Sequence, residues 1–184
     1  MIPQALLNAE EIENEIIEIC KDKKSNQLRR VYFEQKLQKM LESNDIDIFM
    51  NGYLGFAHLA TMVDNNITAM QNYMNKLGQV VQNTHYYATY SYFFFLFEEL
   101  EKAKEKLLLA LDSPVVSYED FQRIIFVAEA LNDYEINKKI IEQCKKFSNT
   151  EEYALIQMEL GEISPFDFNK KDYVAIDLNE FFNV

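Results

Sequence analysis

The sequence is poor in the residues that make tight turns. It holds 4 glycines and 3 prolines among 184 residues. A fold built from many β-hairpins needs turn residues at short intervals, so this scarcity argues against an all-β architecture. It favours long helices joined by short links, in a chain long enough for one domain with its own core.

Positive charge is also scarce. The chain carries 18 Lys and Arg against 30 Asp and Glu, with a formal net charge of −12. Such a balance argues against a nucleic-acid backbone or an anionic membrane as the main partner, and we expect neither. The densest basic stretch has acidic neighbours at Glu15, Glu18 and Asp22, which is typical of a solvated helix end. Its members are Lys21, Lys23, Lys24, Arg29 and Arg30.

Cysteine and long apolar runs are few as well. Cys20 and Cys144 lie far apart, which favours free thiols in a reducing compartment. The first residues, 1–4, lack a basic region before an apolar stretch, so we expect no secretory signal. The most apolar run, residues 86–97, is too short to span a bilayer as a helix. These features predict a cytoplasmic protein.

Catalytic and metal-binding signatures are missing. There is no glycine-rich phosphate loop, because Gly52 and Gly55 lie inside a helical pattern, where they permit close packing. Neither a Gly-x-Ser-x-Gly nor a His-Glu-x-x-His motif occurs. The two histidines, His58 and His85, offer little for a metal site. We expect no catalytic residues, no metal and no cofactor.

Apolar residues recur at helical spacing along most of the chain. In the first helix Ile12, Ile16, Ile17 and Cys20 share a face behind the acidic first turn that follows Asn8. The second helix, after Ser25-Asn26, has its apolar positions at Leu28, Val31, Tyr32, Leu37, Met40 and Leu41. Six further helices are predicted at residues 46–62, 67–81, 84–98, 100–111, 117–131 and 134–147, with caps at 43–45, Thr84 and Ser117. Residues 151–160 predict one more helix.

Similar residues return every 34 positions. Aligned sets are Tyr53, Tyr87 and Phe121; Phe56, Tyr90 and Ile124; Ala57, Ser91 and Ile125; Ala60, Phe94 and Ala128; and Tyr73, Leu107 and Ile141. Apolar character is kept at most of these positions although size is not. A period of 34 residues with two helices per unit is typical of one class of helical solenoid.

On these residues the chain resembles the tetratricopeptide repeat family over roughly residues 46–148. The middle unit matches best, with Tyr87, Tyr90, Ser91 and Phe94 on its first helix and Ala103, Leu107 and Ala110 on its second. The first unit departs from the family pattern at Lys76 and the third at Asn137. The family's glycine on the first helix is replaced by Ala57, Ser91 and Ile125.

The resemblance implies an all-α superhelix of about four to five antiparallel helix pairs. We expect one domain, with an N-terminal helix pair over residues 1–44, three repeats over 45–148, and a capping helix and tail over 149–184. The aromatic tail contains Phe166, Phe168, Tyr173, Phe181 and Phe182. It is expected to fold back over the last helices; the alternatives are a segment held in the protein's own groove or offered to a partner.

The resemblance also implies a concave groove lined by the first helix of each unit. The positions that face it are Asn51, Leu54, His58 and Thr61; His85, Ala88, Tyr92 and Phe95; and Glu119, Gln122, Phe126 and Glu129. Members that grip a terminal carboxylate use Lys, Arg and Asn there, because a carboxylate needs charged donors. No Lys or Arg stands at these positions, although Arg123 is close, so the groove is expected to be aromatic with acidic edges.

Two readings of the aromatic residues stay open. Tyr92 and Phe95 line a groove, or they belong to a helix that is buried on both sides. For His58 and His85 a packed, structural role is the favoured reading.

The leading functional prediction is a non-enzymatic adaptor that binds an apolar protein segment and resembles the three-repeat secretion chaperones at fold level. The alternatives are a peptide-responsive regulator without its own DNA-binding domain, and an enzyme on a helical scaffold. The expected partner is a protein or peptide, and a homodimer is possible.

Overall fold

The computed structural model describes residues 7–22, 26–112 and 118–144. These residues form eight α-helices and one π-helical turn, and none of them lies in a β-strand. The helices are α1 (Ala9–Lys21), α2 (Gln27–Met40), α3 (Ile46–His58), α4 (Ile67–Leu77), α5 (Thr84–Leu96), α6 (Leu100–Asp112), α7 (Tyr118–Leu131) and α8 (Tyr134–Cys144). The π-helical turn η1 (Leu59–Val63) continues α3. The all-α prediction is therefore confirmed for the described residues.

Short polar side chains start several of these helices. The Asn8 side chain accepts a hydrogen bond from the backbone N–H of Glu11, whose carboxylate in turn accepts from the Asn8 N–H, so α1 begins with a capping box. The Asp45 carboxylate caps α3 by accepting from the N–H groups of Asp47 and Ile48, and the Asn66 side chain caps α4 through the N–H of Ala69. These caps satisfy N–H groups that have no partner inside the helix.

Most helices begin within one residue of the position that the sequence predicted. Some of the predicted helix ends and one predicted cap were wrong. The cap of α5 is Asn83, whose side-chain Oδ1 accepts from the N–H of Tyr86 at 2.9 Å. Thr84 is instead the first helical residue. α4 ends at Leu77 and α5 at Leu96, both earlier than expected. The expected cap at Ser117, the end of the last repeat helix near 147, the capping helix and the aromatic tail lie outside the described residues.

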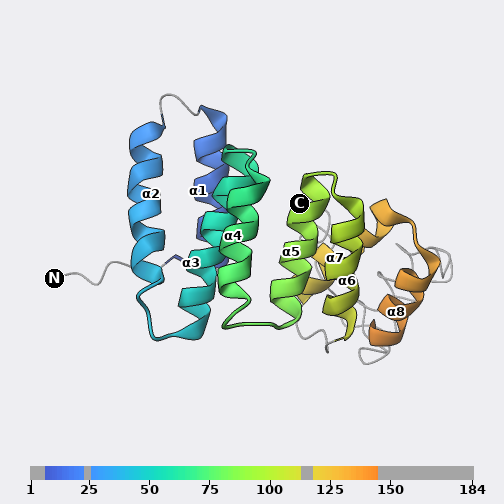
Figure 1. Cartoon of the computed structure of the whole chain (residues 1–184). Helices are drawn as coiled ribbons and strands as arrows, with labels where there is room; N and C mark the ends of the chain where they lie inside the picture. Colours follow the sequence, from blue (N-terminus) through green and yellow to red (C-terminus); the bar gives the residue numbers. More distant parts are fainter. Residues whose placement is uncertain (1–6, 23–25, 113–117, 145–184) are drawn as a thin grey trace, which may run out of the picture.

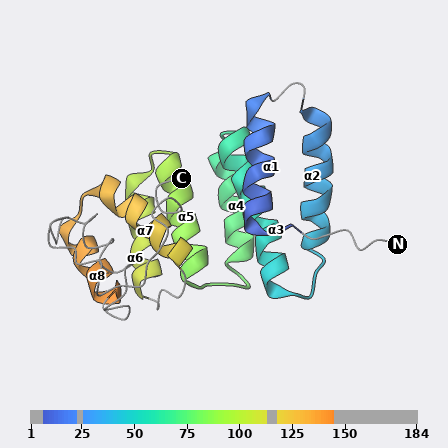
Figure 2. The same cartoon turned by 180° about the vertical axis from the view of Figure 1, so that it is seen from behind.

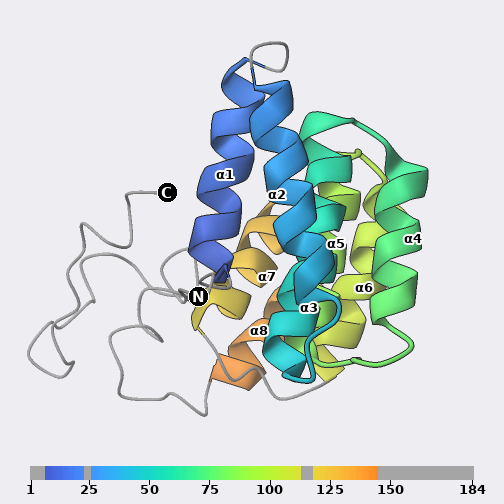
Figure 3. The same cartoon turned by 90° about the vertical axis from the view of Figure 1, so that its left-hand side faces the viewer.

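The helices pack antiparallel and follow one another across the molecule (Figure 1). α5 lies near the middle and packs most extensively against α6, and also against α7. The same stack seen from behind has α1 and α7 in front (Figure 2). From the side, α4 and α6 lie on one side, with α1 and α7 on the other (Figure 3). The N-terminal helix thus shares a face of the molecule with α7, more than a hundred residues later.

The core has two parts. The larger runs from α3 and α4 to α8 and centres on Phe93, Leu107 and Ile124, all fully buried. The smaller joins α1 and α2 to η1 through Ile16, Leu37 and Leu59. Burial of such side chains contributes roughly 1.5–3 kcal/mol each.

The glycines of α3 allow α2 to approach closely, as the sequence predicts. A Cβ atom at Gly55 would lie 2.5 Å from Cδ2 of the fully buried Leu37, and one at Gly52 would lie 2.8 Å from Cδ2 of Leu41. Neither distance is compatible with an ordinary van der Waals contact. Both glycines are therefore packing residues rather than part of a ligand loop.

The apolar faces of α1 and α2 differ from the expected ones. On α1 Ile19 joins Ile12 and Ile16 in the core, while Ile17 is 53% exposed. On α2 the buried residues are Phe33, Leu37 and Met40. The exposed ones are Leu28, Val31 and Tyr32. α2 lies at the outer edge of the stack, so part of its apolar surface has no neighbouring helix among the described residues (Figure 1).

The turns that join α3 to α4, α5 to α6 and α7 to α8 each contain one left-handed residue. These are Asn65 (φ 47°), Glu98 (φ 59°) and Asn132 (φ 47°). Asn tolerates this conformation, whereas Glu is less suited to it because its Cβ crowds the backbone. The turn at Glu98 is therefore the more strained of the three.

Candidate functional site

Three aromatic side chains from α5 and α7 meet at the surface. The Phe126 ring packs edge-on against Tyr92, with ring centroids 5.7 Å apart, and against Phe95, with centroids 5.4 Å apart. Phe126 is 49% exposed, while Tyr92 and Phe95 are partly buried. We call Tyr92, Phe95 and Phe126 the aromatic surface. The structure thus brings together the three aromatic residues that the register assigned to the groove.

A polar layer lies between the same two helices. Nδ1 of His85 is 2.7 Å from Oδ1 of Asp120, a carboxylate that is almost fully buried. One turn further along, Arg123 Nη1 donates to the Thr89 hydroxyl at 3.5 Å. A buried carboxylate is costly without a partner, so the contact with His85 helps to fix α7 against α5. His85 therefore has a structural contact here, consistent with the favoured reading of its sequence.

The N-terminal helix reaches this region through a charged residue. Glu13 of α1 accepts from Nη2 of Arg123 at 3.4 Å, across 110 positions of sequence. Burial, assisted by the negative charge of Glu13, raises the pKa of the Tyr92 hydroxyl. Glu13 is therefore close to the aromatic surface. The 34-residue register did not predict it, because α1 stands outside the repeats.

His58 is a partly buried side chain that packs against the core. Its imidazole lies edge-on to the Phe93 ring, with centroids 4.8 Å apart and an angle of 71°. Burial, with a smaller contribution from the charge of Arg123, lowers its pKa from 6.5 to about 4. His58 is therefore neutral at physiological pH.

The other residues assigned to the groove differ widely in solvent exposure. Leu54, Thr61 and Ala88 are buried, which makes them core residues. Asn51 and Gln122 are partly exposed, and Glu129 is exposed. α1 packs against α3 and η1, so it contacts the helix that was expected to line the groove in the first unit. The candidate site thus reduces to α5, α7 and the adjacent part of α1; the side chain of Glu119 lies outside the described set.

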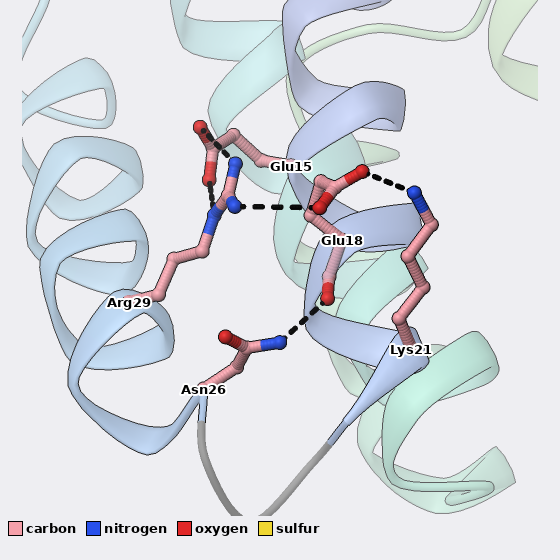
Figure 4. Close-up of polar contacts among 5 residues, drawn as sticks. All are labelled: Glu15, Glu18, Lys21, Asn26 and Arg29. Carbon is pink, nitrogen blue, oxygen red and sulfur yellow. Dashed lines mark hydrogen bonds and ion pairs between the residues drawn. The ribbon is translucent and has the colours of Figure 1, made fainter.

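Two described members of the basic stretch, Lys21 and Arg29, are paired with acids (Figure 4). Arg29 donates to both carboxylate oxygens of Glu15, at 2.8 and 3.1 Å, and Lys21 donates to Glu18 at 2.5 Å. The Asn26 amide donates to the Glu18 carbonyl at 2.8 Å and ties the turn to α1. An open depression of about 310 Å³ lies beside these pairs, lined by Glu15, Leu28, Arg29, Tyr32, Phe33 and Lys36. Its walls are half charged and half apolar, without a group poised for chemistry.

The described part of the chain has neither a metal-binding cluster nor a membrane-spanning helix. It contains no group of three or more His, Cys, Asp or Glu residues arranged to hold a metal ion. Within the same residues, no helix has the length and apolar character needed to cross a bilayer. Cys20 is a free thiol that donates to the carbonyl of Met62 at 3.6 Å.

No protein-family model matches the chain, and neither a curated protein nor a solved structure matches it significantly.

Proposed function

We propose that this protein is a non-enzymatic interaction module, built from tetratricopeptide-like repeats, that holds an apolar segment of another protein against the aromatic surface. The observation that carries the proposal is the half-exposed Phe126 in contact with two further rings. Aromatic residues at the centre of an exposed patch provide much of the binding energy in protein interfaces.

The gain from covering this surface is appreciable. A phenylalanine side chain buries about 200 Å² when fully enclosed, so covering the exposed half of Phe126 removes roughly 100 Å² of apolar area from water. At about 25 cal/mol per Å² this contributes about 2.5 kcal/mol, before any contact with Tyr92 or Phe95. Association itself costs several kcal/mol, so Phe126 supplies part of the binding free energy and contacts with Tyr92 and Phe95 must add to it.

Contacts one repeat apart support the repeat interpretation. Tyr92 meets Phe126 and Thr89 meets Arg123, in both cases 34 residues apart. His58 and Phe93 are 35 residues apart, as are His85 and Asp120. The left-handed turn residues Asn65, Glu98 and Asn132 follow one another at nearly the same interval. A solenoid places equivalent residues of successive units side by side in this way.

Peptide display on the full chain tests the proposal. Peptides selected on the wild-type protein should be rich in apolar residues and should lose at least about tenfold in affinity on Phe126→Ala. The matched control is Leu28→Ala, which removes a 66% exposed apolar side chain from α2. α2 lies at the outer edge of the stack, whereas the aromatic surface belongs to α5 and α7 (Figure 1). Equal losses for the two variants, or none for Phe126→Ala, would contradict the proposed function.

A further inference from the structure

The charges around the aromatic surface are mostly negative. α5, which supplies Tyr92 and Phe95, contains no Asp, Glu, Lys or Arg at all. α7, which packs against α5 and supplies Phe126, has three acids and one Arg, and α1, which reaches α7 through Glu13, has five Glu and one Lys. By contrast, α2 at the outer edge has four basic residues and one acid. α1 and α7 lie on the same side of the molecule, and α7 carries Phe126 (Figure 3).

Two of these acids lie where a bound segment would meet them. Glu129 is exposed and stands three residues after Phe126, which places both side chains on one face of α7. Glu13 approaches α7 from α1, and its charge also acts on the Tyr92 hydroxyl. Glu15 and Glu18 of α1 are instead turned to Arg29 of α2 (Figure 4).

The positive charge of Arg123, beside the aromatic surface, is largely balanced by its neighbours. The Arg123 side chain is 15% exposed, and its guanidinium already faces Glu13 and Thr89. Glu13 keeps 49% of its side chain exposed, so a bound segment would meet the carboxylates of Glu13 and Glu129 more readily than the guanidinium of Arg123. Carboxylates on the segment would be repelled there, which costs affinity, whereas ammonium or guanidinium groups would be attracted.

We propose that the occupant of the aromatic surface is an amphipathic, cationic segment of another protein, with apolar side chains on Phe126, Tyr92 and Phe95 and Lys or Arg beside Glu13 and Glu129. This inference rests on the proposed function and adds the chemistry of the partner. The formal charge of −12 steers such a segment toward the protein from a distance.

The test uses three labelled helical peptides and the full-length chain. Leu occupies the same helical face in all three, and the other positions are Lys, Gln or Glu. Fluorescence anisotropy gives the Kd of each. We expect the Leu/Lys peptide to bind at least about tenfold more tightly than the Leu/Gln peptide at low salt, with the Leu/Glu peptide weakest.

Charge reversal separates a local effect from the net charge. Glu129→Lys should weaken the Leu/Lys peptide about fivefold and leave the Leu/Gln peptide within about twofold. Glu42→Lys changes the net charge equally at an exposed site between α2 and α3, and should alter neither peptide by more than about twofold. Equal effects of Glu129→Lys and Glu42→Lys would overturn the proposal.

Other outcomes of these binding experiments would identify a different occupant of the aromatic surface. If Phe126→Ala weakens all three peptides equally and the Lys and Gln peptides bind alike, the proposed function stands while the cationic partner is wrong. If Phe126→Ala changes no Kd, both fail. A photo-crosslinker placed at position 126 gives one more test. If it links to residues 163–184 or to a second copy of the protein, in protein that binds no peptide, the proposal of a cationic partner is overturned.

Discussion

Replacing His58 by leucine should remove much of the protein's sensitivity to mild acid. Burial holds the imidazole pKa near 4, against 6.5 for an exposed histidine. Between these two values the unfolded chain takes up a proton that the folded chain does not. The free energy of unfolding therefore falls as the pH drops from above 6.5 toward 4.

The size of this effect follows from the shift. Each pKa unit corresponds to about 1.4 kcal/mol, so the full shift amounts to about 3 kcal/mol and roughly 2 kcal/mol of it is lost between pH 7 and pH 5. Leucine keeps an apolar contact with Phe93 and has no proton to bind. Between pH 7 and pH 5, the free energy of unfolding of the His58→Leu variant should therefore fall by about 2 kcal/mol less than that of the wild-type protein.

Urea denaturation followed by far-UV circular dichroism at both pH values measures the difference. The variant itself serves as the control, because its remaining pH dependence reports the carboxylates. Equal losses in the two proteins would refute the reasoning. They would mean that the imidazole is open to water, as a groove residue would be.

Three substitutions test the packing, a turn and a cap by the same denaturation assay. Gly55→Ala should lower the free energy of unfolding by about 1 kcal/mol or more. The cost of crowding the buried Leu37 exceeds the gain of about 1 kcal/mol in helix propensity. A more stable variant would show that α2 and α3 pack less tightly. Glu98→Gly should raise it by about 1 kcal/mol by relieving the left-handed backbone, and a loss would contradict that conformation. Asn83→Ala should lower it by about 1 kcal/mol through loss of the α5 cap, whereas Thr84→Ala should leave that cap intact.

The sequence predicted the helices well because their starts are marked by local chemistry. Asn8, Asp45 and Asn66 act within a few residues of their own position, so their role is visible in the sequence. Asn83 and Thr84 are adjacent and both suit a cap. The choice between them depends on which oxygen reaches the N–H of Tyr86, and the pattern does not contain that information.

Burial was harder to predict than helix position. Neighbouring residues such as Ile16 and Ile17 have the same apolar character, and only the position of the next helix determines which one is covered. The contact of Glu13 with Arg123 depends on how α1 lies across the stack. The aromatic surface was found because the 34-residue register aligned Tyr92 with Phe126, and contacts between repeats follow such a register.

Whether Phe126 serves binding or the core is the central question, and one variant measured in two ways answers it. For Phe126→Ala in the full chain, we expect a loss of unfolding free energy of no more than about 1–2 kcal/mol, because half of the side chain is already exposed. We also expect at least a tenfold rise in the Kd of a selected apolar peptide. A loss of about 3–5 kcal/mol, typical of a core phenylalanine, together with an unchanged Kd, would show that Phe126 serves the core and not binding.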